Sequence, residues 1–174
     1  VTDNFLHALV ATLSTGPVGF SDAVGYTNAT LVKSTCAKDG MLLKPSLPLA
    51  AIDRSFSIGS NQSIVAPPVP TGSHVWTTHT SAADQTWWFV LAISVEQPWE
   101  LLRSDLYPVL SLSEQVVVYD YRDPAGTAKL IEVNQTVLWE IQTPPAADGY
   151  HGFAYLVIAP IIPTSGGWAL LGEL

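Results

Sequence analysis

The sequence contains few charged residues and a single cysteine. Charged residues fill only 13% of the 174 positions, and 7 Lys and Arg against 15 Asp and Glu leave a formal net charge of -8. Nucleic-acid binding needs a basic face that neutralises phosphates, and this composition cannot build one. We therefore expect no nucleic-acid partner.

The lone Cys36 excludes an intrachain disulfide and any zinc site built from several cysteines. We expect Cys36 to be a small buried side chain on a helix. The chain also lacks a Gly-rich phosphate loop and a Gly-X-Ser-X-Gly elbow, which argues against a nucleotide-binding loop and against a serine hydrolase. We predict no cofactor and no metal.

Long apolar runs are also missing. The longest, residues 87–93 and 153–162, fall short of the roughly 20 residues that span a bilayer, and Pro160 interrupts the second. No transmembrane helix is predicted. The N-terminus does not resemble a secretory signal, because Asp3 comes early and the first basic residue is Lys33. We expect a piece of a longer chain, or one from which a signal was removed.

Asparagine indicates the compartment. Three of the four Asn open an Asn-X-Ser/Thr sequon, namely Asn28, Asn61 and Asn134. Ser and Thr fill 30 of 174 positions, so chance would place fewer than one of four Asn in this context. We predict a secreted or extracellular glycoprotein with these three positions on its surface.

The N-terminal quarter has helical spacing. In residues 3–13, apolar side chains recur at the spacing of one helix face behind Thr2 or Asp3 as N-cap: Phe5, Leu6, Leu9, Val10 and Leu13. Gly16 and Pro17 end this helix, residues 18–20 form a short apolar run, and a second helix is expected over 28–37. This order of helix, short strand and helix is typical of an α/β barrel repeat.

After Pro45 the chain becomes rich in β-branched and aromatic residues, with turn residues about every ten positions, which predicts an antiparallel β-sandwich. The expected strands are 51–58, 74–80, 86–95, 115–121, 129–133, 137–142, 152–159 and 168–171. Within 86–95, the odd-numbered residues are expected to face the core and the even-numbered ones a more mixed environment. We expect Leu91 to share a buried face with residues 152–159.

A set of motifs follows the first predicted helix, in this order: Gly16-Pro17-Val18-Gly19-Phe20-Ser21-Asp22, Val24-Gly25, Asn28, Leu31 and Asp39-Gly40-Met41-Leu42-Leu43-Lys44-Pro45. This set resembles the raffinose synthase and alkaline α-galactosidase group of glycoside hydrolases. The resemblance covers about the first third of the chain, and Arg54-Ser55-Phe56 after Asp53 looks like that group's Arg-Asp-X-X-Phe, with Arg and Asp in reversed order.

The resemblance implies that residues 1–45 are the last βα unit of a (β/α)8 barrel and that 46–174 are an appended antiparallel β-sandwich. It places Ser21 and Asp22 at a strand end, where barrel enzymes bind substrate, with Asp22 accepting hydrogen bonds from sugar hydroxyls. In the group, the two catalytic Asp come from the fourth and sixth barrel strands. Those strands are not in this chain, so it would contain no catalytic residue.

Other interpretations of these residues remain open. Asp22 could be a turn residue that accepts from the amides of Val24 or Gly25. Asp53 and Arg54 could form an ordinary ion pair. His74 and His79 should lie on opposite strand faces, which argues against a shared metal.

Tryptophan could serve sugar stacking, with Trp76, Trp88 and Trp99 as candidates, or plain core packing.

Two functional hypotheses follow. The first is the C-terminal portion of a secreted glycoside hydrolase-like protein that acts on α-galactosyl or related glycans, with carbohydrate and the parent barrel as partners. The second is a non-catalytic extracellular glycoprotein module with a structural or glycan-binding role, or one that assembles with other extracellular chains.

Overall fold

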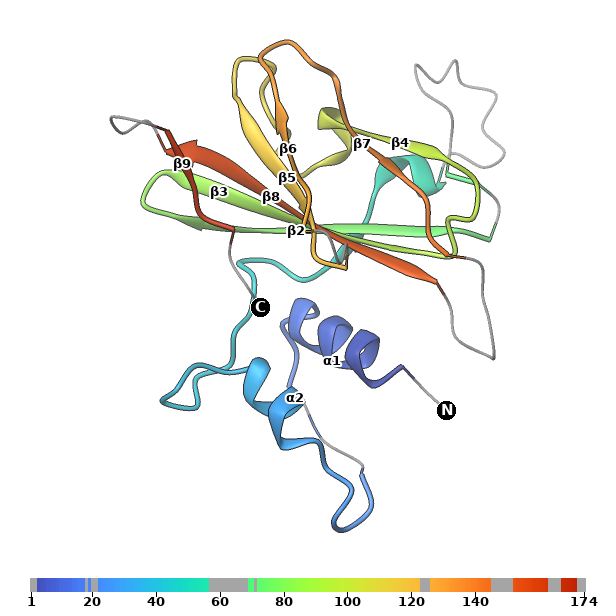
Figure 1. Ribbon diagram of the computed structural model, residues 1–174, viewed down its shortest axis with the longest axis vertical. Coiled ribbons are helices and arrows are strands. Elements are labelled where there is room, and N and C mark those ends of the chain that lie inside the picture. Colours follow the sequence, from blue (N-terminus) through green and yellow to red (C-terminus); the bar gives the residue numbers. More distant parts are fainter. Residues whose placement is uncertain are drawn as a thin grey trace.

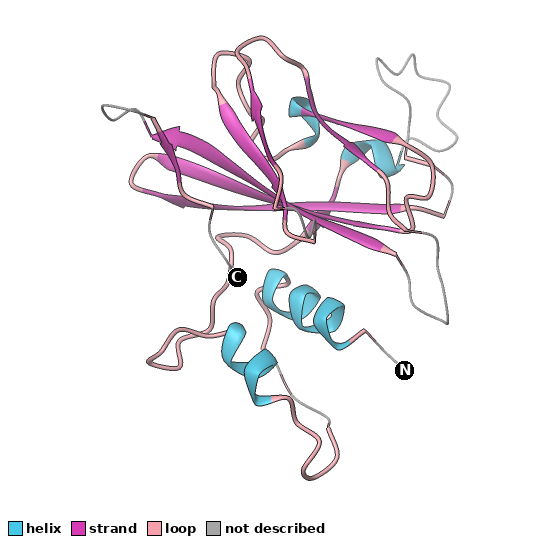
Figure 2. Cartoon of the chain, in the orientation of Figure 1, coloured by secondary structure: helices cyan, strands magenta, loops and turns pink. Residues whose placement is uncertain are grey.

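The computed structural model describes residues 3–17, 19, 22–56, 69–70, 72–122, 126–144, 152–162 and 167–171. It is mainly antiparallel β, with two sheets and few helices, consistent with a β-sandwich (Figures 1 and 2). The larger sheet lies in the middle, with the small sheet on one face and the α-helices on the other. Within the described part, no helix is long and apolar enough to cross a membrane.

The larger sheet has the strand order β1-β2-β3-β8-β5-β6, and β9 pairs with β8. The small sheet pairs β4 (Trp99–Leu102) with β7 (Val137–Ile141). The strands of the larger sheet are β1 (Ala50–Ala51), β2 (His74–Ala82), β3 (Gln85–Ile93), β5 (Val116–Asp120), β6 (Ala128–Ile131), β8 (Phe153–Ile162) and β9 (Trp168–Ala169).

Strand β8 is central, as its apolar sequence requires. It pairs with β3 on one side and with β5 on the other, and residues 153–160 are all buried. A strand that is apolar on both faces would promote aggregation at a sheet edge. The β2–β3 hairpin turns at Ala83 and Asp84, whose φ angles of 49° and 63° are those of a type I′ turn.

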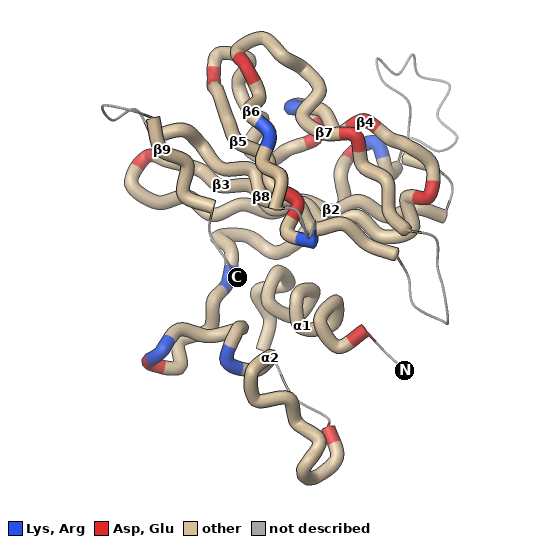
Figure 3. The backbone as a smooth tube through the Cα atoms, in the orientation of Figure 1, with Lys and Arg blue, Asp and Glu red and all other residues tan. Residues whose placement is uncertain are grey.

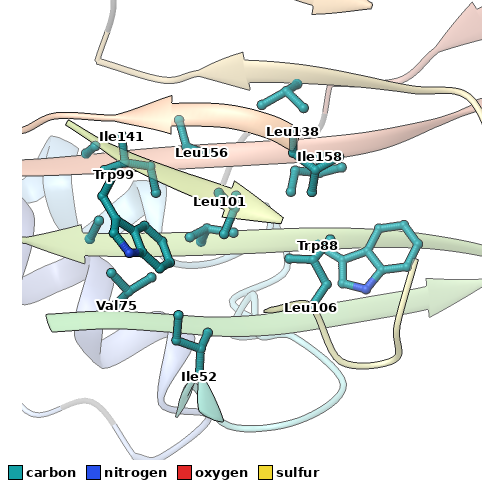
Figure 4. Close-up of a cluster of buried hydrophobic side chains, with 14 of the residues drawn as sticks. Ile52, Val75, Trp88, Trp99, Leu101, Leu106, Leu138, Ile141, Leu156 and Ile158 are labelled. Atoms are coloured by element: carbon teal, nitrogen blue, oxygen red, sulfur yellow. The ribbon is translucent and has the colours of Figure 1, made fainter. Parts of the chain in front are cut away.

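Two hydrophobic cores lie on opposite faces of the larger sheet. The inter-sheet core contains Trp88, Val90 and Ala92 of β3 together with Leu101 and Leu138 of the small sheet (Figure 4). The even-numbered face of β3 is therefore buried and apolar at Trp88, Val90 and Ala92, whereas Thr86 at its start is polar and half-buried. Alternate residues of a strand point to opposite sides, so a central strand covered on both sides needs both faces apolar.

The second core lies under helix α1 (Asn4–Leu13), where Leu91 is fully buried and shares a cluster with Phe153, Tyr155 and Val157. This confirms the shared face predicted for Leu91. Leu6, Leu9 and Leu13 of α1 cover the cluster, whereas Val10 is exposed, contrary to expectation. Asp3 caps α1, since its Oδ1 accepts from the amides of Phe5 and Leu6 at 3.1 Å.

Three expectations need correction. The predicted strand 51–58 is replaced by β1 and the 3-10 helix η1 (Asp53–Phe56), because Arg54 turns inward to a buried partner. Strand β4 was not predicted. The second helix, α2, spans only Ala29–Ser34. Cys36 therefore lies after the helix, where it is half-buried and its backbone forms an isolated antiparallel β-bridge with Leu42. Residues 18–20 include positions outside the described residues, so their predicted strand stays a prediction.

Candidate functional site

The predicted sugar contact Asp22 lies in a shallow hollow between α1 and α2. The hollow has a volume of about 180 Å³ and is also lined by His7, Tyr26 and Asn28. Asp22 is exposed, and no hydrogen bond joins its carboxylate to the amides of Val24 or Gly25 within the described chain. Ser21, its predicted partner in substrate binding, lies outside the described residues.

This hollow does not contain the groups for glycoside hydrolysis. A retaining or inverting glycosidase needs two carboxyl groups that flank the scissile bond. Among the described lining residues, Asp22 is the only carboxylate. The hollow can therefore contact a sugar hydroxyl but cannot supply both an acid and a nucleophile.

Two of the predicted glycosylation positions are exposed, as expected. Asn28 is the N-cap of α2, and its Oδ1 accepts from the amides of Thr30 and Leu31 at 3.1 Å. Its side-chain nitrogen, the atom that carries an N-glycan, is not needed for the cap. Asn134 lies in an exposed turn with a φ of 66°. Asn61 falls outside the described residues.

A larger cleft opens on the sandwich itself. It has a volume of about 500 Å³ and lies between strands β1 and β2 and the 3-10 helices η1 and η2 (Arg103–Asp105). Its walls include Leu47 and Val109, and its polar lining includes Thr77, His79 and Ser104. This volume is in the range of small-molecule sites.

A buried ion pair between Arg54 and Asp105 lines this cleft. Arg54 Nε lies 2.7 Å from Asp105 Oδ1, and Nη2 donates to the other carboxylate oxygen and to the carbonyl of Glu100. The guanidinium also stacks over the ring of Trp99, 4.0 Å from its centroid. Arg54 thus pairs with a residue 51 positions away, and its sequence neighbour Asp53 is exposed on η1.

Asp105 is fixed on both of its oxygens. Besides Arg54, its carboxylate accepts from the backbone amide of Leu102 at 2.7 Å. The guanidinium and the amide hold this carboxylate in one position through charge-assisted hydrogen bonds, which is a structural role. Asp105 and Asp53 therefore do not form an acid and base pair for hydrolysis.

The outer part of the cleft is aromatic. His79 on β2 and Tyr107 after η2 meet edge to face, with ring centroids 6.0 Å apart. Tyr107 is 67% exposed and lines the cleft. Sequence reasoning missed Tyr107 and Asp105, because they come near in space to β1 and β2 only through the fold.

The tryptophans favour packing over sugar stacking. Trp88 and Trp99 are each 3% exposed in the inter-sheet core. Trp76 is half-buried and stacks on His74, with ring centroids 5.2 Å apart. Trp168, which was not a candidate, is exposed on β9. Core packing is thus the correct interpretation for Trp88 and Trp99.

Charged side chains are sparse over the described chain. Figure 3 shows Lys and Arg at isolated positions, several of them in the helical segment. Arg103 is buried, and it donates to the carbonyls of Gln135, Ser111 and Glu132. Desolvation by burial lowers the pKa of Arg103, and the charge of Glu114 opposes this shift. No cluster of His, Cys, Asp and Glu suited to a metal occurs in the part of the chain that the structure describes.

Among the described residues, the chain therefore has a hollow lined by one carboxylate, Asp22, and a cleft in which the charges of Arg54 and Asp105 neutralise each other. No family model, curated protein or solved structure matches the chain.

Proposed function

We propose that this chain is the C-terminal, non-reacting portion of a secreted glycoside hydrolase-like protein that acts on α-galactosyl or related glycans. Its two catalytic carboxylates lie outside this chain. Residues 1–45 form the last βα unit of the parent (β/α)8 barrel, and 46–174 form the appended sandwich. The proposal rests on the motif resemblance in the first third of the chain and on one structural observation.

That observation is a set of exposed apolar side chains on residues 22–42, which we name the docking surface. It comprises Val24, Tyr26, Met41 and Leu42, all of them exposed, and Val24 is completely so. Helix α2 within this segment has no buried residue. Figure 1 shows α2 on the far side of α1 from the sheets. Several exposed apolar side chains in one short segment favour contact with a partner.

The docking surface and the sandwich differ in how well their apolar residues are covered. Helix α1 buries its apolar stripe against the larger sheet, whereas no residue of α2 is buried, although Thr35 directly after it is. A helix that contributes so little to a core gains its stability from a partner. In the proposed parent, neighbouring barrel units cover this face, as each helix of a barrel packs between its neighbours.

Activity assays test this proposal. The isolated chain should not hydrolyse an aryl α-galactoside, whereas the parent protein should. In the parent, Asp22→Asn should lower kcat/KM about tenfold to a hundredfold, because a hydrogen bond to a charged acceptor is lost. The matched control is Asp39→Asn, since Asp39 is an exposed turn residue whose carboxylate accepts from Met41. Hydrolysis by the isolated chain would refute the placement of the catalytic pair.

The alternative is a non-catalytic extracellular glycoprotein module that binds glycans or assembles with other chains. It is favoured by the absence of a free carboxylate pair in the cleft and in the hollow, among their described lining residues. An inactive parent that still covers the docking surface would support this alternative.

A further inference from the structure

We propose that the cleft between β1, β2, η1 and η2 binds a neutral sugar of one or two rings, with Tyr107 as the stacking surface. This site is separate from the Asp22 hollow and from the docking surface. It does not depend on where the catalytic residues of the parent lie.

The charge in the cleft favours a neutral ligand. Arg54 is the only Lys or Arg among the described lining residues, and Asp105 neutralises it through two oxygens. Asp53 adds an exposed negative charge to the lining. Among the described lining residues, a phosphate or carboxylate ligand would therefore find no uncompensated Lys or Arg.

The hydrogen-bonding groups of the cleft suit hydroxyls. Thr77, His79 and Ser104 line it, and their side chains form no hydrogen bond with any residue that the structure describes. Hydroxyl and imidazole groups can both donate and accept, as sugar hydroxyls do. Thr78, by contrast, already donates to the carbonyl of Leu47.

The apolar groups of the cleft suit the faces of a sugar ring. Tyr107 presents an accessible ring that meets His79 edge to face. Leu47 and Val109 add apolar walls. A pocket with mainly apolar walls and a few convergent polar groups matches a ligand with apolar C–H faces and a polar rim.

An NMR titration of the isolated chain tests this site. The probes are methyl α-galactoside, methyl α-glucoside, methyl α-mannoside and melibiose, each added to about 50 mM to detect Kd values in the millimolar range. At least one should shift the amide signals of Thr77, His79 and Ser104. Tyr107→Ala should weaken that binding about threefold to tenfold, whereas Tyr107→Phe should retain it.

Two controls make the test specific. Trp168→Ala removes a similarly accessible aromatic ring, 71% exposed on β9 and outside both the cleft and the hollow, and should leave the affinity unchanged. Inorganic phosphate should not shift the cleft signals. The proposal is overturned if no sugar shifts them, if Tyr107→Ala binds as tightly as the unmodified chain, or if phosphate competes with the sugar. None of these outcomes bears on the docking surface, so the two proposals fail separately.

Discussion

Arg54 and Asp105 join two segments that lie 51 residues apart, through a hydrogen-bonded ion pair whose side chains are 9% and 4% exposed. The pair ties η1, which precedes β2, to η2, which follows β4. It closes one end of the inter-sheet core and shapes the cleft above it. Breaking this pair should therefore affect both the stability of the sandwich and the shape of the cleft.

Removing one partner should cost more stability than removing both. Asp105→Ala leaves the Arg54 charge buried and uncompensated, which should lower the free energy of unfolding by about 3 to 5 kcal/mol. The double variant Arg54→Met with Asp105→Leu should recover most of that loss. Urea unfolding of the single and double variants measures both effects. A single variant within about 0.5 kcal/mol of the unmodified chain would show that the pair is unimportant for stability.

Truncating Leu91 tests the core under α1. Leu91 is fully buried among side chains of β3, β8 and α1, so Leu91→Ala should lower the free energy of unfolding by about 2 to 5 kcal/mol. Leu130→Ala is the matched control, since Leu130 lies on edge strand β6 and is 47% exposed. It should change stability by less than about 1 kcal/mol. Equal losses in the two variants would contradict the packing described for β3.

Stability should fall at high pH because of Tyr155. Burial raises the pKa of Tyr155 well above its ordinary value of 10.0, and the nearby Tyr121 adds to the shift. Above about pH 10 the unfolded chain loses this proton while the folded chain keeps it, so the free energy of unfolding falls as pH rises. The loss approaches about 1.4 kcal/mol per pH unit for this one group.

The variant Tyr155→Phe isolates that effect. The buried hydroxyl has no hydrogen-bond partner among the described residues, so the variant should be nearly as stable at pH 7. Chemical denaturation between pH 9 and 11 should give a smaller loss of stability for Tyr155→Phe than for the unmodified chain. Parallel pH profiles would mean that Tyr155 ionises like a free tyrosine.

Glycosylation is expected at one or more of Asn28, Asn61 and Asn134 in the source organism. Intact-mass analysis before and after deglycosylation measures it, and an unchanged mass would argue against the secretory route. At Asn28 the helix cap must be separated from the glycan. Asn28→Asp removes the sequon but keeps an oxygen acceptor for α2, so it should remove that glycan with little loss of stability.

The sequence predicts the elements whose spacing is long and regular. The helix behind Asp3 and the strands around Leu91 and residues 153–162 follow directly from apolar periodicity. Strand β4 was missed because four residues, Trp99 to Leu102, are too few to show alternation. The local sequence of η1 predicts a strand instead of a 3-10 helix. Arg54 turns inward because it pairs with Asp105, and the residues next to Arg54 do not indicate this distant partner.

For the candidate sites too, local features could be predicted from the sequence, whereas contacts between distant segments could not. Exposure of Asn28, Asn134 and Asp22 could be expected from turn residues near them. The cleft could not be predicted, because Leu47, His79 and Tyr107 meet only after β1, β2 and η2 have taken their places. The burial of Trp88 and Trp99 likewise depends on which strands form the second sheet of the predicted sandwich, and the local pattern does not show that.

Hydrogen-deuterium exchange of α2 tests the central claim most directly, because the docking surface should be covered in the parent protein and open in the isolated chain. Amides of residues 29–42 should exchange at least about tenfold more slowly in the parent. Amides of β8 are the internal control, since they lie in the centre of the larger sheet and should be equally protected in both. Equal exchange of residues 29–42 in the two proteins would contradict the account.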